Sequence, residues 1–212
     1  MSSPIVSLRG LGVRFGTTRV LADIDLDIAP GTALGITGPN GAGKTTLLEV
    51  IATMVRPSEG SGTVLGIPLG DRDIRLVRPK IGMSGHDPGL YPELTLLENL
   101  DLVERLFGTV AMSARQVLDV VGLSGASDRR ASDSSNGMLR RVDLARLLMT
   151  RPDLILLDEA HAGLDHAARE IVARLIDLTR RNGGAAVVVS HDASVLAERV
   201  DRIVTVSDGR LL

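Results

Sequence analysis

The sequence predicts an α/β fold in which helices cover a mostly parallel sheet, and three observations carry this prediction. Apolar runs of strand length alternate with runs of helical spacing over most of the 212 residues, which is the pattern of parallel βα units. A glycine-rich loop at 38–45 joins one such strand to a helix, and a second apolar run, 154–157, ends in two carboxylates. Because ligands bind at the carboxyl ends of strands in open parallel sheets, we expect these two segments to meet there.

The first half of the chain combines an antiparallel part with the start of the parallel sheet. Alternating apolar residues with glycine-containing turns are typical of short antiparallel strands. We expect, in order, a small antiparallel sheet over 5–28 with turns at Arg9-Gly10 and Gly16-Thr17, a strand at 32–37, a helix at 45–54, a loop at 57–62, and short strands at 63–65 and 81–84.

The second half begins with a helical block and then returns to strands. Thr95 with Glu98 and Ser113 with Gln116 have the spacing of capping boxes, so each pair marks the start of a helix. Gly122 is a plausible helix stop. We expect helices at 95–107, 116–121 and 136–150, a strand at 154–157, a helix at 165–181, and strands at 185–190 and 203–206.

The loop at 38–45 satisfies the phosphate-binding pattern G-x-x-x-x-G-K-[ST]. Its glycines let the backbone turn N–H groups towards phosphates, and the following helix offers its partially positive N-terminus. Lys44 supplies a positive charge for the outer phosphates, and Thr45 supplies a hydroxyl for Mg²⁺. The candidate phosphate-binding residues are Gly38, Pro39, Asn40, Gly41, Ala42, Gly43, Lys44, Thr45 and Thr46.

The apolar run at 154–157 continues into Asp158 and Glu159. At the carboxyl end of a parallel strand, both acids would lie where Lys44 points. Asp158 is the better candidate for holding Mg²⁺, directly or through water, and Glu159 for polarising the attacking water. His191 follows another apolar run and is placed to contact a γ-phosphate or to order the water, although a lone histidine at a strand end is more often structural.

Composition excludes several functions. The net charge of −2, the single Tyr, the two Phe and the absence of Trp give no reason to expect a nucleic-acid partner. The absence of cysteine excludes disulfides and thiolate metal sites. The first ten residues lack the apolar core of a signal peptide, and no apolar run approaches the roughly 18–20 residues that span a bilayer. We therefore expect a protein that is soluble or that reaches a membrane only through a partner.

Five motifs in this order resemble those of the ATP-binding subunit of an ABC transporter, over essentially the whole chain. The glycine-rich loop resembles the Walker A motif of that family, and LILLDE resembles its Walker B motif. SSNGM is similar to the signature LSGGQ, AGLD to the D-loop, and the histidine after the AAVVV run falls on the switch histidine. These matches lie at 38–45, 154–159, 134–138, 162–165 and His191.

The resemblance implies an ATP hydrolase with the P-loop NTPase fold, which pairs head to tail with a second such subunit. Each ATP would lie between the phosphate loop of one subunit and the signature of the other. Phe15 falls where the family stacks an aromatic side chain on adenine, and a core Phe of a small sheet is the alternative. The implied cofactors are ATP and Mg²⁺. The implied catalytic residues are Lys44, Glu159 and His191, and the implied metal ligands are Thr45 and Asp158, with His86 as a weaker one. The implied signature residues are Ser135, Asn136, Gly137 and Met138, and Asp165 belongs to the D-loop.

The chain departs from the family pattern at four places. His86 stands where the family usually has Gln, and the signature has Asn136 and Met138 in place of a Gly and a Gln. Ala160 and Ala162 replace the usual Pro and Ser. None of these changes removes the lysine, the two acids or the histidine of the site, so the resemblance still implies an active ATPase.

The resemblance also implies an organisation and a partner. We expect one domain over 1–212, with 1–86 and 151–212 as the nucleotide-binding core and 87–150 as an inserted helical subdomain that carries the signature. The implied partners are a second ATPase subunit, identical or different, and an integral membrane permease, which places the chain on the cytoplasmic face of the membrane. An apolar group beside residue 86 would meet the permease or simply pack within the subdomain; it consists of Leu90, Tyr91, Pro92 and Leu94.

Single sequence features indicate what such a transporter would carry and which other functions compete with transport. GHDPGLYPELTLLENL at 85–100 is most similar to the ATPase subunit of the haem exporter used in cytochrome c maturation, although simple drug, lipid or peptide exporters share part of it. The alternatives are an ABC ATPase acting on DNA or ribosomes, which salt-dependent nucleic-acid binding would indicate, and a nucleotide-gated interaction module with weak hydrolysis. A P-loop metabolite kinase explains neither SSNGM nor His191.

Overall fold

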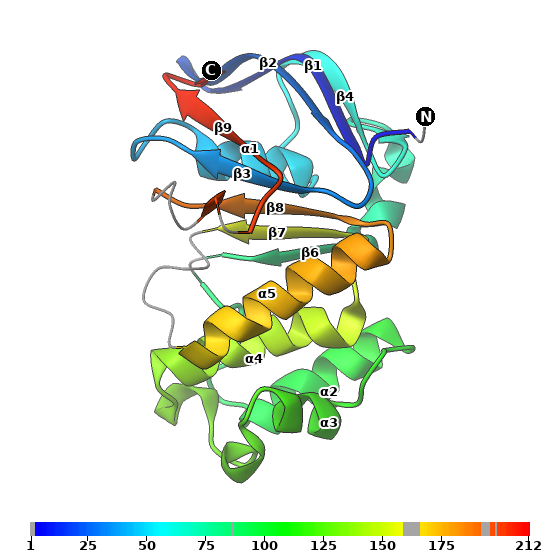
Figure 1. Cartoon of the computed structure of the whole chain (residues 1–212), viewed down its shortest axis with the longest axis vertical. Helices are drawn as coiled ribbons and strands as arrows, with labels where there is room; N and C mark the ends of the chain where they lie inside the picture. The colour runs from blue at the N-terminus through cyan, green and yellow to red at the C-terminus, as the bar shows by residue number, and fades with distance from the viewer. Residues whose placement is uncertain (1–2, 86, 159–165, 192–195, 198) are drawn as a thin grey trace.

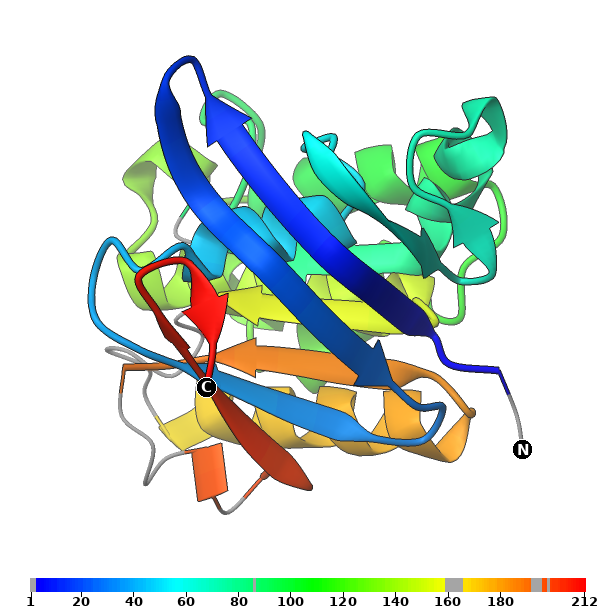
Figure 2. The ribbon, with the colours of Figure 1, turned by 90° about the horizontal axis from the view of Figure 1, so that it is seen from above.

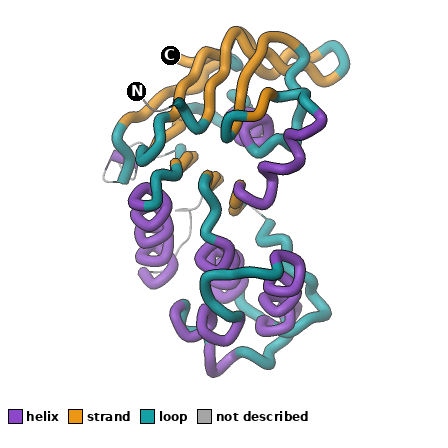
Figure 3. Tube along the Cα trace, turned by 90° about the vertical axis from the view of Figure 1, so that its right-hand side faces the viewer, coloured by secondary structure: helices purple, strands orange, loops and turns teal. Residues whose placement is uncertain are grey.

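The computed structural model describes residues 3–85, 87–158, 166–191, 196–197 and 199–212, and its elements form layers (Figure 1). An antiparallel sheet lies at one end, the helix α1 lies between it and a larger sheet, and the helices α4 and α5 cover the opposite face of that larger sheet. The helices α2 and α3 lie beyond α4, so that the side view separates the strands from most of the helices (Figure 3).

The larger sheet is almost entirely parallel, as the sequence predicts. Its strand order is β10-β9-β3-β8-β7-β6, and only β10 runs antiparallel to its neighbour. Since β3 lies between β8 and β9, the phosphate loop that follows β3 emerges near the middle of the sheet. The strands are β3 (Ala33–Thr37), β6 (Ile81–Ser84), β7 (Leu154–Asp158), β8 (Ala185–Val189), β9 (Arg202–Ser207) and β10 (Arg210–Leu211).

Alternating side chains of β7 and β8 divide the core into two apolar clusters. Leu154 and Leu156 pack with α1 and the antiparallel sheet, whereas Ile155 and Leu157 pack with the helices of the other face. This is the period of two expected for a strand covered on both faces. All four side chains are fully buried. The packing on both faces therefore fixes the position of the carboxyl end of the strand.

The smaller sheet has the order β2-β1-β4-β5 and is antiparallel. Seen from above, its long strands cross the core strands obliquely (Figure 2). The turn at Gly16-Thr17 is confirmed, because it joins β1 directly to β2. The strands are β1 (Val6–Phe15), β2 (Thr18–Ile28), β4 (Glu59–Val64) and β5 (Ile67–Pro68).

Two predictions for this sheet were wrong. Arg9-Gly10 is not a turn, since β1 continues through it with a register irregularity between Leu8 and Leu11. The segment predicted as a loop at 57–62 contributes most of β4. Its glycines serve close strand approach: a Cβ on Gly60 would lie 2.3 Å from the Gly10 carbonyl oxygen. Glycine here marks crowding between backbones and not a loop.

The helical predictions hold better. Both capping boxes are present, with Thr95 and Ser113 as N-caps, and Gly122 follows the end of α3 with a positive φ of 69°. The first helix ends earlier than predicted, before Thr53, whose φ of 62° is left-handed. A 3₁₀ segment, η1 (Arg72–Lys80), was not predicted. The α-helices are α1 (Lys44–Ile51), α2 (Leu96–Phe107), α3 (Ala114–Val120), α4 (Asn136–Thr150) and α5 (His166–Arg181).

Length and hydropathy of the helices bear on the membrane prediction. Within the described residues, no helix combines the length and the apolar character needed to cross a bilayer.

Candidate nucleotide-binding site

Sheet register brings three motif-bearing segments to one edge. Ile36 of β3 and Asp158 of β7 both pair with Val189 of β8, so the three strands end at the same level. The residues that follow these ends are the phosphate loop after β3 and Ser190-His191 after β8. The parallel topology therefore brings the phosphate loop to the same edge as two segments that lie more than 100 residues later in the sequence.

The phosphate loop is shaped by close backbone packing at its two ends. Gly38 has a φ of 144°, and a Cβ there would lie 2.1 Å from the Val206 carbonyl oxygen. Gly43 has a φ of 104°, and a Cβ there would lie 2.8 Å from a methyl group of Leu21. Both positions thus require glycine, for conformation and for space. The loop is pressed against β9 and β2, which fixes its curvature.

Lys44 is held inside this loop. Its ammonium group donates to the carbonyl oxygens of Gly38 and Pro39, at 2.8 and 2.9 Å, and the residue is only 8% exposed. A buried ammonium needs such acceptors. Its position across the loop places a positive charge at the centre of the predicted phosphate cradle.

The N-terminus of α1 is left open for an anion. In the described part of the chain no side chain caps this helix, which begins after Gly43, and its first turn contains no acidic residue. The first backbone N–H groups of a helix need acceptors, and the helix dipole favours negative charge there. A phosphate group would satisfy both requirements.

Thr45 and Asp158 connect the two predicted halves of the site. The Thr45 hydroxyl donates to Oδ2 of Asp158 at 2.9 Å, across 113 positions of sequence. A hydroxyl and a carboxylate oxygen side by side are hard donors of the kind that Mg²⁺ prefers, so the pair fits this ion. Among the described residues no cluster of three or more His, Cys, Asp or Glu is placed to hold a metal, and water and phosphate oxygens would complete the shell of a Mg²⁺ ion.

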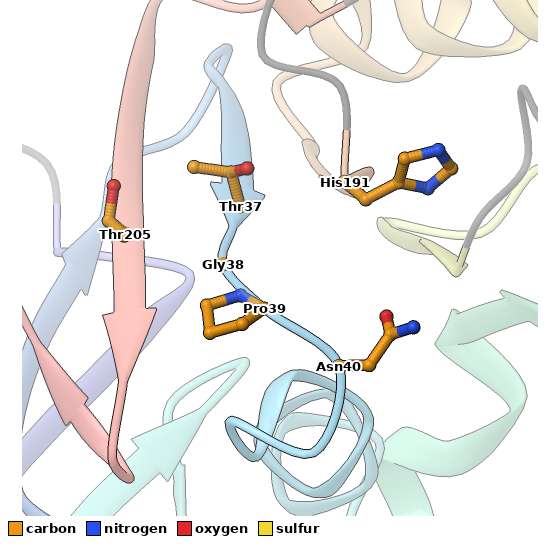
Figure 4. Close-up of a pocket in the computed structure, with 6 residues that line it drawn as sticks. All are labelled: Thr37, Gly38, Pro39, Asn40, His191 and Thr205. Carbon is orange, nitrogen blue, oxygen red and sulfur yellow. The ribbon is translucent and has the colours of Figure 1, made fainter.

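A pocket of about 520 Å³ opens beside the loop. Figure 4 shows the His191 ring and the Asn40 amide on the same side of the phosphate loop. His191 is exposed, as a group that must reach a ligand has to be. The lining residues are Thr37, Gly38, Pro39, Asn40, His191 and Thr205; Thr37 and Thr205 were not predicted, because a threonine in a strand gives no sequence signal of ligand contact.

The signature segment lies at the start of α4. Ser135 is the N-cap of this helix, and its hydroxyl accepts from the Met138 backbone N–H at 3.3 Å. Ser135 and Asn136 are exposed, and Gly137 and Met138 are half-buried. The serine hydrogen remains available for donation to an acceptor outside the helix.

Other predicted residues have mixed outcomes. Phe15 is 53% exposed at the end of β1 and is therefore not a core residue. In the apolar group near residue 86, Tyr91 is 58% exposed and Pro92 is also exposed, whereas Leu90 and Leu94 are half-buried. Five of the predicted positions lie outside the described residues: His86, Glu159, Ala160, Ala162 and Asp165.

Two buried polar residues of the helices α2 and α4 were missed. Asn99 of α2 is 4% exposed, and its side-chain amide accepts from Tyr91 N–H and donates to carbonyl oxygens of the 91–95 segment. Asp143 of α4 is fully buried and pairs with arginines. Burial raises the pKa of the Asp143 carboxyl, while Arg146 and Ser84 act in the opposite direction. An acid inside the apolar stretch Val142–Ala145 was the available signal.

The glycine-rich phosphate loop joins a central strand to a helix, and an aspartate on a nearby parallel strand accepts a hydrogen bond from the loop threonine. This arrangement defines a P-loop nucleotide-binding protein. A family model described as ABC transporter matches residues 21–162. The chain therefore belongs to this family, as an ATP-binding domain.

Individual relatives support the assignment. An uncharacterized ABC transporter ATP-binding protein of Nostoc sp. is 38% identical over 100% of the chain, which spans 60% of that relative's length. A phosphonates import ATP-binding protein of Alcaligenes faecalis is 34% identical, and the match covers 92% of this chain and 76% of that relative. A Nod factor export ATP-binding protein of Rhizobium sp. is 34% identical over 100% of the chain and 71% of its own length.

A solved structure gives the same fold. It is a dimeric, post-hydrolysis state of an ATP-binding cassette bound to ADP and Pi, with a TM-score of 0.84 and 30% identity over 97% of this chain and 96% of that one. The predicted P-loop NTPase fold is thereby confirmed.

Proposed function

We propose that the protein binds and hydrolyses ATP as one half of a two-cassette unit that powers a membrane transporter. The observation that carries this proposal is the 2.9 Å hydrogen bond between Thr45 and Asp158. It brings the phosphate loop and the acidic strand end together beside the open N-terminus of α1. This is the combination that phosphoryl transfer from a nucleoside triphosphate requires.

The phosphate loop and its lysine bind the triphosphate. Loop N–H groups and the N-terminus of α1 receive the phosphate oxygens, and Lys44 exchanges its two carbonyl acceptors for the outer phosphates. We propose that Thr45 and Asp158 hold Mg²⁺, with His86 as a weaker candidate; the ion would neutralise phosphate charge. Phe15, which is exposed, would stack on the adenine.

Hydrolysis is assigned to two further side chains. Glu159 directly follows Asp158 in the sequence and would polarise the attacking water. His191 lines the pocket beside Asn40 and would order that water or contact the γ-phosphate. Both groups act by positioning and electrostatics, which is the main source of catalysis in phosphoryl transfer.

The second cassette completes the site. We propose that residues 87–150 act as a helical subdomain on a core made of 1–86 and 151–212, and that it presents Ser135, Asn136, Gly137 and Met138 to the ATP of the partner subunit. The exposure of Ser135 and Asn136 supports contact with a second chain. Asp165 would lie at the same junction, and the similar solved structure is a dimer with ADP and Pi.

The membrane partner and cargo are further steps. The exposed Tyr91 and Pro92 are candidates for contact with a permease, which would hold the chain at the cytoplasmic face of the membrane. Relatives named for phosphonate import and for Nod factor export are both 34% identical, so an exporter role rests on the 85–100 segment alone. Haem export rests on the Gly85-His86 pair within it; purification with a haem-binding membrane protein would test it.

The decisive experiment uses Glu159→Gln. We expect purified wild-type protein to release phosphate steadily from ATP and the variant to accumulate as an ATP-bound dimer, measured by size-exclusion chromatography with light scattering. Unchanged turnover in the variant would reject Glu159 as the base. A variant that binds ATP but stays monomeric would overturn the two-cassette proposal, and wild-type binding without turnover would favour the nucleotide-gated interaction module.

A further inference from the structure

Three side chains on one side of α4 form hydrogen bonds with three successive residues, the last two of β6 and the one that follows it. The helix residues are spaced by three, so they project from the same face. We call this set of contacts the β6–α4 clasp. It consists of Arg146 Nη2 donating to the Met83 carbonyl oxygen at 2.9 Å, Ser84 Oγ donating to Asp143 Oδ2 at 2.6 Å, and Arg140 Nη1 donating to the Gly85 carbonyl oxygen.

The centre of the clasp is a carboxylate removed from water. The Asp143 side chain is 0% exposed and also pairs with Arg146 at 2.6 Å and Arg140 at 3.5 Å. Burying an ion pair costs desolvation, and packed apolar side chains often stabilise a fold equally well. Stability alone therefore does not explain the clasp. What it does provide is a fixed position of one backbone segment against another.

The clasp lies between the two functional segments of the chain. Ser84 pairs with Leu157 in the parallel register of β6 and β7, and the next residue of β7, Asp158, holds Thr45. At the N-terminal end of α4, the N-cap is Ser135 of the signature segment. Covalent and hydrogen-bonded structure thus runs without a break from the phosphate loop to the signature.

Nucleotide binding must alter the first contact of this route. Lys44 and Thr45 are engaged by loop carbonyls and by Asp158, and a bound triphosphate competes for both. A ligand shifts a structure only through such differential contacts. The change at Asp158 then reaches β7, its neighbour β6 and the clasp.

We propose that the β6–α4 clasp makes α4 follow the end of β6, so that ATP in the phosphate loop positions Ser135 for the second subunit. Ser84, Arg140, Asp143 and Arg146 are positioning residues in this scheme, since they act through α4. The inference rests on the proposed function, in which Ser135 contacts ATP on the partner.

The test separates nucleotide binding from nucleotide-driven dimerisation. Ser84→Ala and Arg140→Gln are each placed in a Glu159→Gln background, with Val142→Ala as the control. Val142 is a fully buried neighbour on the same helix that belongs to the apolar cluster of the helical face. Each protein is measured for affinity towards a fluorescent ATP analogue, for dimer formation at saturating ATP, and for melting temperature without nucleotide.

We expect both clasp variants to bind the analogue within twofold of the parent and to lose at least tenfold in dimer association. Val142→Ala should melt at a lower temperature and dimerise like the parent. The double variant Ser84→Ala/Arg140→Gln should lose less than the two single losses combined, because both residues serve one unit. Arg140→Lys, which keeps the charge beside Asp143, provides the comparison if Arg140→Gln does not fold.

The outcomes are distinct. Clasp variants that dimerise within twofold of the parent overturn the inference and leave the proposed function intact. So does a loss in Val142→Ala that matches theirs, because stability would then explain both. A parent that binds ATP and remains monomeric overturns the proposed function, and the inference falls with it.

Discussion

The two helices whose N-termini we propose for contact with ATP, α1 and α4, begin in opposite ways. The helix α4 starts with Ser135, whose hydroxyl accepts from the third N–H of the helix, and α2 and α3 start with complete capping boxes. The helix α1 starts after Gly43, and within the described residues no side chain caps it. Side chains of the protein thus cap the start of each of these three helices, whereas the start of α1 has no such cap among the described residues.

This difference assigns separate roles to the two helix ends. An uncapped N-terminus with a buried lysine beside it attracts several negative charges, so α1 can bind phosphate groups within one chain. The N-terminus of α4 already has an internal acceptor and is exposed. It can add one hydroxyl donor to an anion that is held elsewhere, which is what a site shared between two subunits needs.

The largest effect should come from removing the charge at the phosphate loop. Lys44→Ala removes the ammonium group that bridges Gly38 and Pro39 and that would bind the outer phosphates. Deleting one such preorganised group costs catalysis about 100- to 1,000-fold. We expect a loss of that size in phosphate release, measured at saturating ATP.

Lys80 is the matched control, because the sequence contains no other lysine. It is exposed and reaches Asp153 only at 3.9 Å. Exposed pairs of this kind contribute little, so Lys80→Ala should retain turnover within twofold. An equal loss in both variants would show that Lys44 acts through overall charge and not through its place in the loop.

The shape of the loop should matter next. In Gly38→Ala the new Cβ would collide with the Val206 carbonyl oxygen at 2.1 Å, so we expect unfolding free energy to fall by roughly 2–4 kcal/mol and nucleotide affinity to be lost. Gly41 also has a positive φ, but no described atom lies within 4 Å of its Cβ position. Gly41→Ala should cost only about 1 kcal/mol. Urea denaturation and ATP titration measure both; equal costs would mean that strain alone decides.

The elements that depend on local chemistry were predictable from the sequence. The capping boxes at Thr95 and Ser113 are confirmed, and α4 has the predicted bounds of 136–150. The errors lie where distant backbones meet. Gly60 lies in a strand because β1 passes close to it. The glycine-rich sequence of 57–62 alone does not indicate that β1 is its neighbour. Tertiary contact reversed the local preference.

The same limit applies to the site. Residue type and spacing were enough to predict the phosphate loop and Asp158, and the structure brings Thr45 and Asp158 together. The β6–α4 clasp was not predicted, because Ser84 and Asp143 are 59 positions apart and neither belongs to a motif. Buried polar contacts between segments become visible only once the register of the strands is known.

Ser135 tests the second half of the comparison, because its two roles can be separated. Ser135→Ala removes the cap and should cost about 1 kcal/mol of unfolding free energy. Ser135→Asp keeps a good cap but brings a negative charge towards phosphate. We expect Ser135→Asp to retain the stability of the wild type and yet to lose at least tenfold in phosphate release, while the ATP affinity of the monomer stays within twofold.

The control for the cap is Ser113→Ala, which removes the N-cap of α3 away from the site. It should lose stability like Ser135→Ala and keep its turnover. If Ser135→Asp hydrolyses ATP at the rate of the wild type, Ser135 is a structural cap and nothing more, and the contrast between α1 and α4 loses its functional meaning.

The smallest effect concerns a capped helix start and its dependence on pH. The Thr95 backbone N–H donates to Glu98 at 2.8 Å, and this bond, with that of the Thr95 hydroxyl, holds the pKa of Glu98 below its ordinary value. A lowered folded-state pKa means that the charged form stabilises the fold above about pH 4.3 and that this contribution disappears as the pH falls through the folded pKa.

Glu98→Gln keeps the acceptor oxygen and removes the charge. We expect the wild type to be slightly more stable than this variant at pH 7 in urea denaturation, and the difference to vanish once the pH has fallen below the lowered pKa of Glu98. Glu93→Gln, at an exposed position just before the helix, should show no such change. A difference that persists at low pH would mean that the shape of the Glu98 side chain, and not its charge, stabilises the N-terminus of α2. The electrostatic contrast between α2 and the uncapped α1 would then depend only on the phosphate loop.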